Sequence, residues 1–181
     1  MRIESPLLTE RLKLDLLDPS RIAPEYLAWI NDPNINRFLE IRFHTQTAAD
    51  LAEFVGTTND SSNNLLLGIF LRACGRHVGN VKLGPILWEH LRADMGIVIG
   101  DSSVWGKGYA TEAIEALTQY AFGNLRLHRI TAGMYTGNIG SHKAFLNAGY
   151  TEDGRLRDYW LSNGEWQDEI VLGRISGLAR D

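Results

Sequence analysis

The spacing of apolar residues changes repeatedly along the chain between the two-residue period of a strand and the longer period of a helix. Leucines at every second position between residues 11 and 17 indicate a strand with one apolar face. Apolar residues three and four positions apart from Ala110 to Ala121 indicate an amphipathic helix. The strands expected in this way are residues 11–17, 65–72, 77–83, 92–99 and 128–135, with a closing hairpin over 151–175. The expected helices are residues 24–29, 47–55, 110–121 and 141–148.

Turn residues separate these elements. Residues 74–75 and 162–164 contain the glycines expected at the turns of two hairpins. Residues 31–34 are expected to end the first helix in a turn, and the polar residues 56–64 are expected to form a loop. Gly96 interrupts the strand over 92–99, which indicates a bulge or a close approach of another backbone.

Composition and charge narrow the classes of protein to which the chain can belong. Of its 181 residues, 44% are apolar and 22% are charged, which is typical of a globular protein, and the length favours one domain over residues 1–181. A net charge of −4, from 18 Lys and Arg against 22 Asp and Glu, disfavours nucleic acid as a partner. The single Cys74 cannot form an internal disulfide. Because no apolar run suits a membrane span or a targeting signal, we expect a cytoplasmic protein that does not contact a membrane.

A glycine-rich loop lies between the strand over 92–99 and the helix that follows it. Backbone amides in such a loop, next to the positive end of a helix, suit a phosphate. Five residues separate Gly100 from Gly106 and Gly108 follows Lys107, whereas a Walker A loop has four intervening residues and a Ser or Thr after its lysine. The third glycine of the dinucleotide-binding fingerprint is also missing. The loop is therefore neither a P-loop nor a Rossmann loop, and taken alone it is also compatible with a plain turn before a helix.

Four segments in the second half of the chain carry a pattern more specific than the loop alone: Trp105-Gly-Lys-Gly-Tyr-Ala-Thr-Glu-Ala113, Leu127-His-Arg-Ile130, Asn138-Ile-Gly-Ser141 and Asn147-Ala-Gly-Tyr150. Together they resemble the GNAT acetyltransferases, in particular the branch with the ribosomal-protein N-terminal alanine and serine acetyltransferases. The resemblance runs from about residue 7 to about residue 175, including segments 8–14, 29–33 and 163–168, and is densest between 93 and 150. It implies an α/β fold with a mixed, mostly antiparallel sheet of about six to seven strands, flanked by about four helices.

The resemblance implies acetyl-CoA as cosubstrate and no metal. In this family the glycine loop binds the pyrophosphate through backbone amides. The matching positions are Gly106, Lys107, Gly108, Ala110 and Thr111. Trp105 stands where many members carry Arg or Gln. The strand segment 95–100 matches a splayed edge that pairs with the pantetheine arm, and the amide of Ile99 or its neighbour is the implied oxyanion donor. Asn138 matches a cofactor-contacting position and also suits a helix N-cap, and both roles are compatible.

Acyl transfer from a thioester to an amine requires a proton acceptor for the amine, a donor to the oxyanion and a proton for the departing thiolate. The resemblance places Ser141 near the thiolate. Many members use a tyrosine four residues later, but Phe145 occupies that position and cannot donate a proton. Protonation of the thiolate is therefore expected from Ser141 or from water.

The identity of the general base is more open. The position that carries a glutamate in some peptide-acetylating relatives corresponds to Gly133 here. Asp94 matches an acidic residue common in this branch, and we select it as the base or as a ligand of the cationic amine. Glu89 and His90 lie just upstream and are the alternatives, of which His90 has the most suitable unperturbed pKa.

The expected acceptor is a primary amine, with a peptide N-terminus favoured by the resemblance. Four acidic residues give the presumed acceptor side a negative bias that attracts a protonated amine. They are Glu89, Asp94, Asp158 and Asp168. A small cationic amine fits equally well, whereas a nucleotide-linked amino sugar needs basic residues such as Arg37, Arg42 and Lys82. A module that binds acyl-CoA without turnover is a further alternative, and the oligomeric state is open, with a homodimer as one option.

Overall fold

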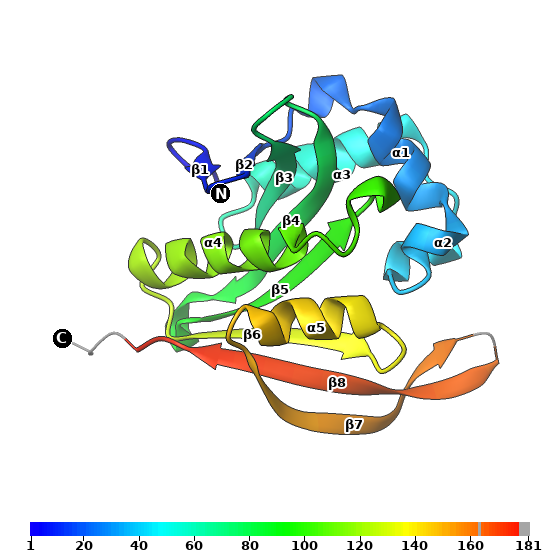
Figure 1. Ribbon diagram of the computed structural model, residues 1–181, viewed down its shortest axis with the longest axis vertical. Coiled ribbons are helices and arrows are strands. Elements are labelled where there is room, and N and C mark those ends of the chain that lie inside the picture. Colours follow the sequence, from blue (N-terminus) through cyan, green and yellow to red (C-terminus); the bar gives the residue numbers. More distant parts are fainter. Residues whose placement is uncertain (163, 178–181) are drawn as a thin grey trace.

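The computed structural model describes residues 1–162 and 164–177 and joins eight strands into one sheet in the order β1-β2-β3-β4-β5-β6-β8-β7 (Figure 1). Neighbouring strands are antiparallel except β5 and β6, which are parallel. The strands are β1 (Leu7–Leu8), β2 (Leu12–Leu16), β3 (Leu65–Leu71), β4 (His77–Leu87), β5 (Arg92–Ile99), β6 (Arg129–Tyr135), β7 (Thr151–Ser162) and β8 (Glu165–Ile175). The helices are α1 (Pro24–Asn31), α2 (Pro33–Asn36), α3 (Ala48–Asp60), α4 (Tyr109–Gly123) and α5 (Ile139–Asn147), with 3-10 turns η1 (Pro19–Arg21), η2 (Glu40–Phe43), η3 (Trp88–His90) and η4 (Ser102–Val104). The expected mixed, mostly antiparallel α/β fold is confirmed.

Helices cover both faces of the sheet, and each face has its own apolar core. The helices α4 and α5 contribute buried residues to the larger core, whereas α1 and α3 contribute to the smaller one. The strand β3 joins the two cores, because Leu65 and Leu67 belong to the larger core and Leu66 to the smaller one. This alternation is what a strand buried on both sides requires.

The described residues contain slightly more elements than the sequence predicts. The two-residue strand β1 brings the sheet to eight strands, and α2 begins at Pro33, where only a turn is expected. The side chain of Asp32 accepts a hydrogen bond from the amide of Asn34 at 2.8 Å, so Asp-Pro starts a short helix here. In the described part of the chain, no helix is long and apolar enough to cross a membrane.

The helix α3 is longer than predicted and includes residues 56–60, which were expected to form a loop. The hydroxyl of Thr57 donates to the carbonyl of Glu53 at 2.8 Å, so this polar side chain is satisfied within the helix. The buried side-chain amide of Asn59 donates from its Nδ2 to the backbone carbonyl of Leu17 at 3.0 Å. Tertiary contacts therefore outweigh the weak helix propensity of this segment.

The bulge expected at Gly96 lies instead on the neighbouring strand. Gly96 pairs in register with Lys82, and the irregularity falls between Leu83 and Ile86 of β4. A Cβ atom at Gly96 would meet no heavy atom within 4 Å, so no backbone approaches closely either. Both predictions for Gly96, a bulge and a close backbone approach, were therefore wrong, because the extra residue lies in β4. The strand β4 is also longer than predicted and continues to Leu87.

Two strands in the centre of the sheet separate along their length. The parallel pairing of β5 and β6 covers Arg92–Asp94 and Arg129–Thr131, although β5 continues to Ile99 and β6 to Tyr135. Figure 1 shows the two strands spreading apart beyond this pairing, with the start of α5 on the widening side. The backbone edges that face each other across this gap are available to a ligand.

The last hairpin, β7 with β8, follows the predicted segment, although Asn163 of its expected turn lies outside the described residues. The strand β8 pairs with both β6 and β7, so the C-terminal segment completes the same sheet.

Candidate functional site

A cleft of about 590 Å³ is formed by the end of β5, the glycine loop, the start of α5 and residues 34, 35 and 37–39 in and after α2. It brings together most of the predicted site residues. Those lining it are Ile99, Gly106, Gly108, Ala110, Thr111, Asn138 and Ser141. Lys107 and Asp94 are not part of its lining.

The glycine loop presents the start of α4 without a side-chain cap. Gly106 and Gly108 have φ angles of 75° and 81°, a region that glycine enters without a steric penalty. Gly108 is the N-cap of α4 and has no side chain to bond the first turn. The amides at the helix start, including those of Ala110 and Thr111, therefore lack intrahelical partners. Together with the positive end of the helix dipole they suit an anion.

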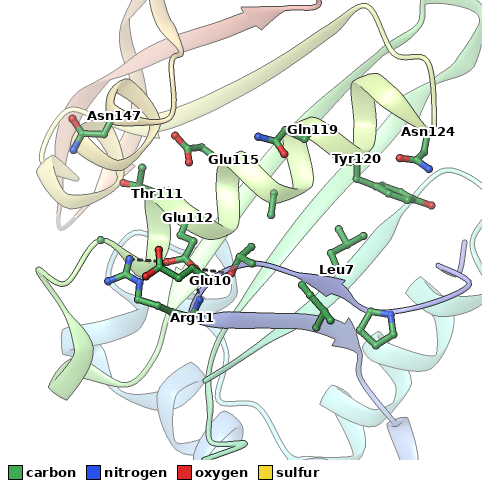
Figure 2. A pocket seen from close by; sticks show the side chains of 15 residues that line it. Leu7, Glu10, Arg11, Thr111, Glu112, Glu115, Gln119, Tyr120, Asn124 and Asn147 are labelled. Atoms are coloured by element: carbon green, nitrogen blue, oxygen red, sulfur yellow. Dashed lines mark hydrogen bonds and ion pairs between the residues drawn. The ribbon is translucent and has the colours of Figure 1, made fainter. Parts of the chain in front are cut away.

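Arg11 connects the loop to the N-terminal segment (Figure 2). Its Nη1 donates to the carbonyl oxygen of Lys107 at 3.0 Å, and its Nε donates to the Glu112 carboxylate at 2.6 Å. The guanidinium lies over the ring of Tyr109, 4.6 Å from its centroid. Arg11 is outside the cleft, so it holds the Lys107 carbonyl away from the cleft. Sequence reasoning missed this contact because 96 positions separate the two residues.

A larger pocket of about 890 Å³ lies between α4 and the N-terminal segment and shares Gly108, Thr111 and Asn147 with the cleft; Figure 2 shows its lining. Three glutamates line it: Glu10, Glu112 and Glu115. Burial raises the pKa of Glu112, but the hydrogen bonds from Thr9 and Arg11 lower it by more than burial raises it. The pKa of Glu112 is therefore below its usual value, and the carboxylate is charged at neutral pH. Arg11 also lines this pocket and pairs with Glu112, but the lining stays net negative and disfavours phosphates, so the smaller cleft is the better anion site.

The exposed edge of β5 points into the gap between β5 and β6. The amide of Gly100 donates to the carbonyl of Val78, which precedes the β4 residue paired with Ile99. Because backbone groups alternate in direction along a strand, the amide and carbonyl of Ile99 point away from β4. The indole Nε1 of Trp105 donates to this carbonyl at 2.8 Å, which fixes the loop against the strand end.

The start of α5 contributes two polar side chains to the cleft, those of Asn138 and Ser141. The Asn138 side chain accepts from the amide of Ser141 at 3.2 Å, so the predicted N-cap geometry is present. Ser141 is half-buried and lines the cleft. Phe145 is 1% exposed and packs edge-on against Tyr150, with ring centroids 5.0 Å apart. The position of the missing tyrosine therefore belongs to the core of this protein.

The candidate bases lie apart from the cleft lining. Asp94 is exposed on β5, at the last residue pair before the strands separate. Its charge acts on Lys82 of the neighbouring strand, whose pKa is lowered by burial and raised in part by Asp94. Glu89 and His90 are exposed on η3.

A polar network missed by sequence reasoning lies on β6. The hydroxyl of Tyr135 donates to the Glu40 carboxylate at 2.5 Å and accepts from Arg42 at 2.8 Å. Trp160 stacks on the Tyr135 ring, with centroids 5.2 Å apart. Glu169 of β8 is the register partner of Tyr135 and shares its face of the sheet. The alternation of residues along β8 predicts that Glu169 lies on one face of its strand. It does not predict that this face adjoins the point where β5 and β6 separate, because that depends on the strand order.

The chain is similar to known proteins in sequence and in fold. The sequence profile of the acetyltransferase (GNAT) domain matches residues 11–151. The chain therefore belongs to the GNAT acetyltransferase family, as its motifs indicate. The probable N-acetyltransferase YjcK of Bacillus subtilis is 37% identical over 109 residues, which span 60% of this chain and 60% of YjcK.

Two solved structures share the fold. The ribosomal L7/L12 α-N-protein acetyltransferase RimL, in complex with coenzyme A, has a TM-score of 0.83 at 17% identity, over 94% of this chain and 98% of RimL. The spermidine N-acetyltransferase of Vibrio cholerae, in complex with CoA and spermine, has a TM-score of 0.79 at 22% identity, over 92% and 96% of the two chains. At these identities the likeness shows the fold alone.

Proposed function

We propose that this protein transfers an acetyl group from acetyl-CoA to a primary amine, by direct attack within a ternary complex. The observation that carries the proposal is the uncapped start of α4 beside the exposed edge of β5, in one cleft. The first feature suits the pyrophosphate of CoA and the second suits its amide-containing pantetheine arm. We also propose that residues 1–181 act as one domain, because β8 completes the sheet begun in the family segment.

In this proposal the pyrophosphate lies against the amides of the loop and of the first turn of α4. The residues that hold it are Gly106, Lys107, Gly108, Ala110 and Thr111. Lys107 takes part through its backbone amide, since its carbonyl is bound by Arg11 and its side chain is exposed. Asn138 holds the start of α5 beside the pantetheine arm, consistent with its capping bond to Ser141.

The chemical step requires an oxyanion donor and a proton for the thiolate. We assign the first role to the amide of Ile99, which the strand alternation points into the gap. We assign the second to Ser141, whose half-buried side chain lines the same cleft. The amine nitrogen attacks the thioester carbonyl carbon, and the intermediate collapses with cleavage of the C–S bond. The thiolate takes a proton from Ser141 or water, which regains one from the nitrogen.

For the acceptor we favour a peptide N-terminus, with a small polyamine as the second candidate. RimL is named for a protein N-terminal acceptor, and the Vibrio cholerae structure contains spermine. A nucleotide-linked amino sugar fits less well. Of the basic residues that its diphosphate would need, Arg37 lines the cleft, but Arg42 is already engaged by Glu40 and Tyr135 and lies over the rings of Phe43 and Tyr135.

Thiol release from acetyl-CoA tests the proposal. The acceptor panel contains Ala- and Ser-starting peptides, the same peptides with blocked N-termini, spermidine and a UDP-linked amino sugar. We expect turnover with the unblocked peptides and none with the blocked ones. Turnover of the sugar alone, lost in Arg42→Ala, would reverse the ranking of acceptors. Binding of CoA without thiol release over the whole panel would indicate a non-catalytic module instead.

A further inference from the structure

A window flanked by two glycines lies just beyond the point where β5 and β6 separate. The last paired residues are Asp94 and Thr131. Two positions further along each strand are Gly96 and Gly133, both exposed. Strand alternation places them on the same face of the sheet as Asp94 and Thr131. A Cβ atom at Gly96 would point into open space, so the backbone here is accessible from this face.

A carboxylate from another strand lies across one side of this window. A Cβ atom at Gly133 would collide with Oε1 of Glu169 and would lie 2.9 Å from its Cδ. Glu169 is the register partner of Tyr135 on β6, so its side chain extends back along β6 toward the separation point. Any larger residue at position 133 would displace this carboxylate. Gly133 therefore makes room for Glu169.

The surroundings of Glu169 favour uptake of a proton. The side chain is half-buried, and among the described residues no Lys, Arg or His forms an ion pair with it within 4 Å. Burial raises the pKa of Glu169, and Asp94 of β5 raises it further, while Trp160 of β7 opposes this shift. Tyr135 of β6 shares the face, but its hydroxyl is engaged by other groups. Lys82 of β4 acts on Asp94.

From this geometry we propose that Glu169 is the general base that accepts a proton from the acceptor amine at the Gly96–Gly133 window. The inference rests on the proposed acetyl transfer and replaces Asp94 as base. Glu169 takes one proton from the ammonium group, directly or through one water, and the nitrogen electron pair then forms the C–N bond. The nitrogen of the intermediate loses a second proton as the thiolate gains one. One proton is thus released overall, and the carboxylate returns to its starting state when it passes this proton to water.

Asp94 has a supporting role in this scheme. Its negative charge attracts the protonated amine to the window and raises the proton affinity of Glu169. Asp94→Asn should therefore weaken acceptor binding and shift the acidic limb of the pH–rate profile to lower pH, without removing it. Glu169→Gln should remove that limb, because the protonating group itself is gone.

The experiment measures thiol release from acetyl-CoA with a Ser-starting peptide and, separately, with spermidine. Glu169→Gln should lower kcat about 10²-fold or more, with unchanged CoA affinity, which also shows that the variant is folded. Glu165→Gln makes the same chemical change at an exposed position of the same strand and should leave kcat unchanged. Gly133→Ala should lower kcat at unchanged CoA affinity, because it displaces the Glu169 carboxylate.

Two results separate this inference from the proposed function. A wild-type kcat and pH profile in Glu169→Gln would overturn the role of Glu169 while leaving the acetyltransferase intact. Loss of the acidic limb in Asp94→Asn with its retention in Glu169→Gln would return the role to Asp94. The absence of thiol release by the unaltered protein with both acceptors would overturn both proposals.

Discussion

Gly108→Ala tests whether the backbone of the glycine loop sets the affinity for CoA. Gly108 has a φ of 81° and caps α4. An L-residue in this conformation costs about 1–2 kcal/mol. A Cβ atom would meet only Nη2 of Arg11, at 3.5 Å, so steric collision adds little. The loop either keeps its conformation, and stability falls by this amount, or it relaxes, and the amides no longer converge on the pyrophosphate.

The strain energy of alanine at position 108 appears either in CoA binding or in the stability of the fold. If the loop relaxes, we expect the Kd for CoA to rise roughly 5- to 30-fold, which corresponds to about 1–2 kcal/mol. If it keeps its conformation, the same cost appears in chemical denaturation, reduced by about 0.4–1 kcal/mol because alanine restricts the unfolded chain. Calorimetric titration with CoA and urea unfolding measure both quantities.

Gly123→Ala is the matched control, because Gly123 ends the same helix without a positive φ and a Cβ atom there would meet nothing within 4 Å. It should leave CoA affinity unchanged. Gly108→Ala with wild-type affinity and wild-type stability would refute the reasoning, since the strain would then be absent from both states.

The remaining predictions concern the loop support and the reaction path. Arg11→Ala should raise the KM for acetyl-CoA about fivefold, roughly 1 kcal/mol for a half-exposed charged hydrogen bond to Lys107; an unchanged KM would contradict the support role. The pKa of Glu112 is lowered in the folded state, so the charged carboxylate stabilises the fold fully above its unfolded pKa, and this stabilisation is lost as pH falls through the folded value. Glu112→Gln should therefore reduce the loss of stability on acidification below about pH 4.5, measured by urea unfolding. Cys74→Ser should retain activity in steady-state assays, since Cys74 is exposed at the β3–β4 turn, whereas isolation of an acetylated protein competent to pass on its acetyl group would overturn direct transfer.

Local signals along the sequence were sufficient for most of the elements. The strand β5 has the predicted bounds, and Asn138 caps α5 as its spacing indicates. The end of α3 was not predictable, because Asn59 is held by the carbonyl of Leu17, 42 residues away. The bulge was placed on the wrong strand because a glycine signals local freedom without showing which partner strand carries the extra residue.

The candidate site divides in the same way. The positions of Gly106 and Gly108 follow from local backbone requirements, and the sequence brings them to the start of a helix without further information. The contact of Arg11 with the Lys107 carbonyl joins residues 96 positions apart, and the partners of Tyr135 are 93 and 95 positions away. Contacts of this length depend on the order of strands in the sheet, which the periodicity of single segments does not reveal.

Two of the departures from the family pattern, at Phe145 and Gly133, have one structural consequence. Phe145 is part of the core and cannot supply a proton, and Gly133 carries no side chain. Neither position handles protons in this chain, although both lie in the segment where the family motifs are densest. Asp94 of that segment lies on the exposed face of β5 and β6, and β8, the strand beside β6, brings a second carboxylate to the same face. That is where Glu169 lies, so the space at Gly133 and the carboxylate that fills it are best understood as one feature built from two strands.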